Sequence, residues 1–213
     1  MATDLESRLL RLEDAKKDIL KLAGGITEAY DGLLYPLDLV AYAVLKRTLA
    51  LIAGFSAHIR AKNFTCAASL LRLHLDSLLR WSAFSFSADC QALANAVLAG
   101  EHMRNLRAAD GKLMTDTYLV GRLAVTQPWV RRVYKQTSGY IHLSRKHVSN
   151  TMTPTGKREE MKIVISAEDE ASVTEDHRIE ACAAMQHITE LLLRWVEDWR
   201  ATKDNPPEFR GAQ

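Results

Sequence analysis

The chain contains few residues that interrupt regular structure, with only 10 Gly and 5 Pro among 213 residues. Sandwiches and barrels built from many short strands need frequent turn formers, so this scarcity disfavours them and favours long helices. The three cysteines are widely spaced and form no C-x-x-C pair. This pattern indicates neither a zinc centre nor a redox disulfide, and we expect no metal and no cofactor.

The sequence also lacks a large excess of charge, and the acidic residues among its first six lead us to expect no export signal. Lys and Arg number 28 against 26 Asp and Glu, so no global field would attract nucleic acid. The most apolar stretch, residues 33–55, carries Asp38, Lys46 and Arg47. Each of these charges costs about 2.5 to 3.5 kcal/mol near a bilayer centre. We therefore expect a cytoplasmic protein with no membrane contact.

Hydrophobic residues recur at helical spacing through most of the chain. We expect Gly24-Gly25 to end the first helix, and Pro36 to break or restart the second. The third predicted helix is apolar on so many sides that it should lie at the centre of the fold. The predicted helices cover about residues 4–23, 27–60, 65–86, 89–99, 119–125, 128–142 and 174–203.

Residues 144–166 break this helical pattern. Thr153 to Gly156 form a predicted turn, and Met161 to Ile165 alternate too briefly for a helix, so we expect residues 147–152 to pair with 161–166. The predicted fold is all-α, a bundle of about six or seven helices with a small two-stranded β-ribbon near 147–166. We divide it into an N-terminal helical arm (1–25), a single helical-bundle domain (26–203) and a flexible tail (204–213).

A line of polar side chains follows the leucine-rich central helix. Ser69, Arg72, Asp76 and Arg80 are spaced by three, four and four residues and so share one face, where Arg72 and Asp76 could pair. A buried ion pair needs further hydrogen-bond partners. The pair either fixes the register of the helix or takes part in ligand binding or catalysis. His74 lies on the apolar side and is expected in the core.

A second polar line follows the helix after Pro128. Tyr134, Ser138 and His142 are each four residues apart, and Arg145 lies three residues further on. We predict that this line faces the first. Tyr134, Ser138 and Arg145 are the candidate ligand-binding residues.

The R-x3-D pattern of Arg72 and Asp76, with the Y-x3-S-x3-H pattern of Tyr134, Ser138 and His142, resembles an uncharacterised family of all-helical bacterial proteins. That family is distantly similar to HEPN domains, helical dimers that include RNases of stress and phage-defence systems. The resemblance implies that Arg72 holds a phosphate, that His142 is an acid or base and that Asp76 or Ser138 orients it. Asp76 replaces the usual Glu, and no Arg is followed by His at the R-x(4–6)-H spacing of HEPN RNases.

The missing catalytic signatures favour a non-catalytic cytoplasmic interaction or regulatory protein. Heptad-like spacing in the terminal helices predicts self-association as a homodimer, and a protein partner is also compatible with it. The alternative is a HEPN-like metal-independent RNase or RNA/phosphate-binding protein, in which Arg72, Asp76 and His142 would be catalytic. The basic segment 131–147 would supply RNA contacts, which we favour less. A third hypothesis, small-ligand sensing in the bundle core, requires a sizeable apolar cavity.

Overall fold

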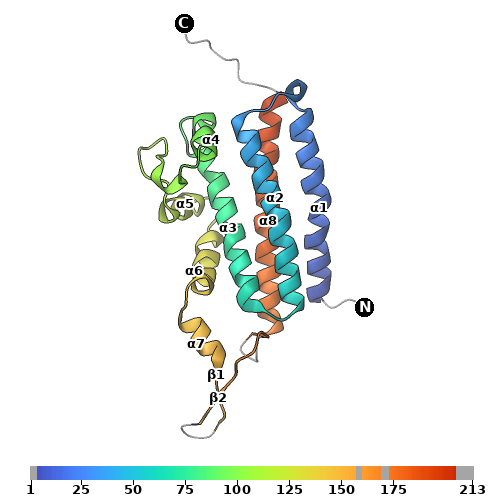
Figure 1. The fold of residues 1–213 in the computed structure, drawn as a ribbon, viewed down its shortest axis with the longest axis vertical. Helices are drawn as coiled ribbons and strands as arrows, with labels where there is room; N and C mark the ends of the chain where they lie inside the picture. The colour runs from blue at the N-terminus through green and yellow to red at the C-terminus, as the bar shows by residue number, and fades with distance from the viewer. Residues whose placement is uncertain (1–3, 157–159, 169–172, 205–213) are drawn as a thin grey trace.

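Four long helices lie side by side in the computed structural model, with shorter helices along one flank and further short elements extending beyond one end (Figure 1). The structure describes residues 4–156, 160–168 and 173–204. The all-α class is confirmed, with eight α-helices in these residues rather than six or seven. The elements are α1 (Asp4–Glu28), η1 (Tyr30–Gly32), α2 (Pro36–Arg60), α3 (Phe64–Ser85), α4 (Cys90–Leu98), η2 (Met103–Asn105), α5 (Asp116–Leu123), α6 (Trp129–Ile141), α7 (Arg145–Thr151), β1 (Met152–Pro154), β2 (Met161–Ile163) and α8 (Glu175–Asp204).

The third helix is the centre of the fold, as its sequence predicts. α3 contacts α2, α4, α5, α6 and α8. It buries Leu71, Leu75, Leu78, Leu79 and Trp81. A helix that is apolar on several sides can be covered only by several neighbours, and this requirement organises the bundle around α3.

Two helix ends differ from the predictions. α1 does not end at Gly24-Gly25 but continues to Glu28, because Ile26 beyond the glycines is completely buried. Burial in the bundle outweighs the helix-breaking tendency of two glycines, about 1 kcal/mol each. The second helix begins at Pro36, the favoured first position, so the proline marks a fresh start.

The terminal helices pack against each other within one chain. α1, the predicted N-terminal arm, lies along α8 and α2 and buries Leu9, Leu12 and Ile19. The heptad-like positions of α8, including Met185, Ile188 and Leu192, are also buried. These helices therefore cover the apolar faces that were expected to drive association between copies.

The strand pairing is shorter than predicted. Residues 145–151 form α7 instead of a strand, because the Ser144 side chain accepts a hydrogen bond from the backbone N–H of Lys146 and caps the helix. The predicted strand is therefore wrong for residues 147–151, and only Met152 of this range lies in a strand. β1 and β2 pair antiparallel over three residues only, with Met152 opposite Ile163. The predicted tail lies outside the described residues after position 204.

α2 is the one described helix whose length and composition would allow it to cross a membrane. This is weak evidence, since the core helix of a soluble protein passes the same test. Leu37, Ala41, Leu45 and Phe55 of α2 face the core of the bundle.

A fully buried ion pair joins three helices at one end of the bundle. Nζ of Lys203 donates to Oδ2 of Asp38 at 2.9 Å and to the carbonyl of Ile26 at 2.9 Å. Asp38 also accepts hydrogen bonds from Nε1 of Trp199 at 2.7 Å and from the backbone N–H of Tyr35 at 2.7 Å. These extra partners offset the cost of removing both charges from water. The network connects the end of α1, the start of α2 and the end of α8.

We predict that Asp38→Ala lowers the free energy of unfolding by about 3 to 5 kcal/mol, because Lys203 would remain charged and buried without its carboxylate. Adding Lys203→Met should recover part of this loss by removing the unpaired charge. Asp18→Ala, at an exposed position of α1, should change stability by less than about 0.5 kcal/mol. Urea unfolding measures all three. A double variant no more stable than Asp38→Ala would contradict the prediction.

Candidate functional site

The two predicted polar lines meet where α3 lies against α6. The guanidinium of Arg72 lies over the ring of Tyr134, 4.2 Å from its centroid. Nη2 of Arg72 donates to Oδ2 of Asp116 on α5 at 3.2 Å, and the Tyr134 hydroxyl donates to the same oxygen at 3.4 Å. Arg72 is thus held by a carboxylate and an aromatic ring.

The predicted pairing of Arg72 with Asp76 is wrong. Asp76 lies 3.2 Å from Nη2 of Arg80, one turn further along α3, and Arg80 also donates to Oδ1 of Asp116. Two guanidiniums therefore face two carboxylates, so the cluster is neutral as a whole. Its charged groups already have partners, which leaves little positive potential for a phosphate.

Asp116 is the member of this cluster that the sequence analysis missed. It is the first residue of α5, after Thr115, whose side chain caps the helix by accepting from the N–H of Tyr118. A Thr-Asp pair before a predicted helix could have marked this position as a helix start. Nothing in the spacing indicated that the carboxylate would reach α3.

The serines of the two lines bind backbone carbonyls. Oγ of Ser69 donates to the carbonyl of Tyr140 at 3.1 Å and connects α3 to the end of α6. Oγ of Ser138 donates to the carbonyl of Tyr134 within its own helix, at 2.6 Å. Both hydroxyls thus make structural hydrogen bonds.

The remaining predicted residues lie away from the cluster. His142 is exposed and follows the last residue of α6, two turns or about 12 Å along the helix axis from Tyr134. Arg145 is exposed at the start of α7. The structure does not bring His142 to Arg72, and the acid–base arrangement implied by the family resemblance is not formed.

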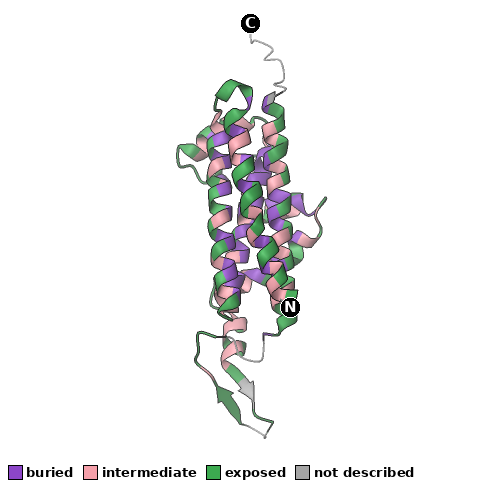
Figure 2. Ribbon diagram, turned by 90° about the vertical axis from the view of Figure 1, so that its right-hand side faces the viewer, coloured by how far each residue is buried: buried purple, intermediate pink, exposed green. Residues whose placement is uncertain are grey.

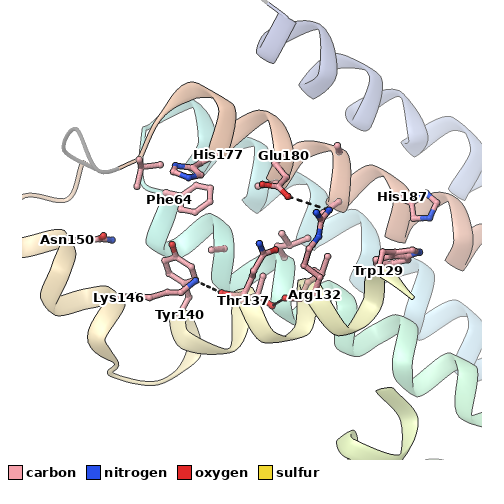
Figure 3. Close-up of a pocket in the computed structure, with 18 residues that line it drawn as sticks. Phe64, Trp129, Arg132, Thr137, Tyr140, Lys146, Asn150, His177, Glu180 and His187 are labelled. Carbon is pink, nitrogen blue, oxygen red and sulfur yellow. Dashed lines mark hydrogen bonds and ion pairs between the residues drawn. The ribbon is translucent and has the colours of Figure 1, made fainter. Parts of the chain in front are cut away.

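A groove of about 410 Å³ lies between α6 and α8, with α3 as its floor (Figure 3). Phe64, Ala68 and Leu71 of α3 form the apolar base. The aromatic ring of Tyr140 meets Phe64 at one end of the groove, and Trp129 meets His187 at the other. This groove is open at the side of the bundle, so it is not the cavity in the core that the third hypothesis requires.

Polar side chains border this groove. Arg132 of α6 forms an ion pair with Glu180 of α8 at 3.4 Å, across the opening. Lys146 of α7 donates to the carbonyl of Gln136 at 2.5 Å and lies over the ring of Tyr140. Burial lowers the pKa of Lys146. The groove thus combines an apolar floor with a partly desolvated cation at one end.

α7 and the β-hairpin project beyond the end of the bundle (Figure 1), and much of this projection is exposed (Figure 2). Several of its exposed residues are large and apolar. Leu143 is 90% exposed and Ile165 91% exposed. We call this set the α7–hairpin surface: Ile141, Leu143, Val148, Met152, Met161, Ile163 and Ile165. Exposed apolar side chains that gather in one segment are typical of a contact surface.

His74 is buried in the core, as expected, but its hydrogen bonding is incomplete. Nε2 lies 2.9 Å from Oγ1 of Thr189 on α8, while Nδ1 has no partner among the described residues. Burial lowers the pKa of His74 to about 3, and the nearby Arg47 adds to this effect. The imidazole is therefore neutral in the folded protein at physiological pH.

No group of three or more His, Cys, Asp or Glu side chains suited to hold a metal is found in the part of the chain that the structure describes. Comparison with known proteins adds no relative: no family model, no curated protein and no solved structure matches the chain. The site must therefore be interpreted from its own geometry.

We predict that Asp116→Ala lowers the free energy of unfolding by about 1 to 3 kcal/mol, because Arg72 and Arg80 lose a shared carboxylate in a half-buried site. His142→Ala should change it by less than about 0.5 kcal/mol, because this side chain is exposed. Chemical denaturation of both variants provides the measurement. The reverse order of effects would mean that His142, not Asp116, supports the α3–α6 contact.

His74 should make stability depend on pH. The unfolded chain protonates this imidazole below about pH 6.5, whereas the folded protein does so only near pH 3. The unfolded state thus binds more protons in this interval, and the free energy of unfolding should decrease as the pH falls from about 6.5 towards 3, by up to about 1.4 kcal/mol per pH unit.

The variant His74→Gln removes this titration and keeps a polar group near Thr189. Its stability should change less between pH 7 and pH 5.5 than that of the unmodified protein, as followed by urea unfolding at each pH. The exposed His142→Gln is the matched control and should keep the original slope. Equal slopes for all three proteins would refute this role of His74.

Proposed function

We propose that the protein acts by association, as a non-catalytic cytoplasmic interaction protein that forms a homodimer through the α7–hairpin surface. The observation that carries this proposal is the concentration of exposed apolar side chains between residues 141 and 165. Each large apolar side chain removed from water contributes about 1.5 to 3 kcal/mol. Seven such side chains could support a stable contact.

A second copy of the chain fits this surface because of its β-hairpin. The three residues of β2 are all exposed, and β1 and β2 form a two-stranded sheet, which is marginal in water without further packing. Both strands have an edge at which backbone groups could pair with another chain. Two hairpins meeting about a two-fold axis would extend the sheet and cover the same apolar side chains on both copies.

The geometry gives less support to the HEPN-like RNase or RNA-binding alternative. That function requires Arg72 and His142 to act on one phosphate, but Arg72 binds Asp116 and His142 is exposed beyond the end of α6. The family resemblance to HEPN-like proteins remains a hypothesis about origin. The helical dimers of that family would be compatible with association without catalysis.

Light scattering at micromolar concentration should give the mass of a dimer for the unmodified protein. Ile163→Lys should shift the protein to a monomer, because it places a charge in the apolar contact. Val125→Lys is the matched control, since Val125 is 77% exposed but lies in the turn after α5. Circular dichroism should show the same helix content in all three. A monomeric unmodified protein, or a dimeric Ile163→Lys variant, would contradict the proposal.

A further inference from the structure

The groove between α6 and α8 has one Lys or Arg side chain that forms no ion pair with any carboxylate in the part of the chain that the structure describes. Of the two Lys or Arg side chains in its lining, Arg132 is paired with Glu180. Lys146 bonds a backbone carbonyl and contacts the ring of Tyr140, and it forms no ion pair with a carboxylate of the described residues. An ammonium group has three donors, so Lys146 can still bind an anion.

The sequence around Lys146 lets this side chain lie close against α6. A methyl group at Gly139 would lie 3.2 Å from Cδ of Lys146 and 3.3 Å from Oγ of Ser144. Glycine in a helix interior costs about 1 kcal/mol relative to alanine, so its place here has a stability cost. That glycine provides the space in which Lys146 reaches the end of the groove.

The shape of the groove fits a long, thin ligand. Lys146 and Tyr140 lie at one end and Trp129 and His187 at the other (Figure 3). Residues 129 and 140 are eleven positions apart on α6, which is about 16 Å along the helix. Between the ends the walls include small side chains, Ala68 of α3 and Ala184 of α8. Arg132, Thr137 and Glu180 also line the middle (Figure 3), so the space is a groove with an apolar floor, partly polar walls and a cation at one end.

We propose that this groove binds a straight-chain aliphatic carboxylate, with its carboxylate on Lys146 and its alkyl chain extending towards Trp129. The apolar floor removes the chain from water, and Lys146 neutralises the single negative charge. A phosphate dianion or nucleotide fits less well, because Glu180 already neutralises the second basic side chain of the lining. This inference is independent of the proposed homodimer.

Titration calorimetry with hexanoate, octanoate, decanoate and dodecanoate, below the concentrations at which they form micelles, tests the site. Affinity should rise about fourfold for each added methylene until the chain fills the groove. The alcohol of equal length should bind at least tenfold more weakly than the carboxylate, because it lacks the charge. Inorganic phosphate should give no measurable heat.

Two variants locate the binding. Lys146→Met should weaken carboxylate binding at least tenfold and leave alcohol binding unchanged, whereas Lys135→Met, on the exposed face of the same region of α6, should leave both unchanged. Gly139→Ala should weaken carboxylate binding by displacing Lys146. Gly121→Ala is its control, because a methyl group there meets no atom within 4 Å.

The monomeric Ile163→Lys variant should bind decanoate as tightly as the unmodified protein does, so failure of the homodimer and failure of this site can be distinguished. Equal affinity for decanoate and decanol, unchanged decanoate binding by Lys146→Met, or no binding of any chain length would overturn the proposal.

Discussion

The burial of α3 is the constraint on which the rest of the structure depends. This helix is apolar on so many sides that five other helices cover it, yet it carries Arg72, Asp76 and Arg80 on one stripe. Charges at such a position need partners from the covering elements, since desolvation would otherwise cost several kcal/mol per ion. Asp116 of α5 and Tyr134 of α6 meet this need. The placement of α5 and α6 is thus tied to the polar stripe of α3 as well as to its leucines.

The charged side chains of the α3 cluster and of the groove fall into two kinds, those that form ion pairs with one another and Lys146, which has no counter-ion among the described residues. A cluster that resembles a catalytic site in sequence is occupied by its own ion pairs and has a balanced charge. The groove on the other side of α6 differs, because Lys146 is partly buried and lacks a counter-ion among the described residues. A charged group without a counter-ion, beside a groove with an apolar floor, is a better indication of a ligand than a cluster of matched ion pairs.

The two proposals place function at the edges of the bundle. α1, α2, α3 and α8 bury most of their large apolar side chains against one another, although Leu10, Leu20, Leu39 and Leu73 remain exposed. The α7–hairpin surface is outside this core, and its apolar side chains remain exposed. The groove exists because α6 and α8 both pack on α3 without closing on each other (Figure 3).

The sequence by itself determined the helical class and the central place of α3, because these follow from hydrophobic spacing along single helices. It could not determine which carboxylate binds Arg72. Asp76, four residues along the same helix, was a suitable partner, but the fold brings Asp116 to Arg72 from a position 40 residues after Asp76. Tertiary structure also decided three further features: the continuation of α1 past two glycines, the pairing of Lys203 with Asp38, and the groove beside Lys146. Each depends on which distant segments share a low-dielectric environment, and local periodicity carries no information about that.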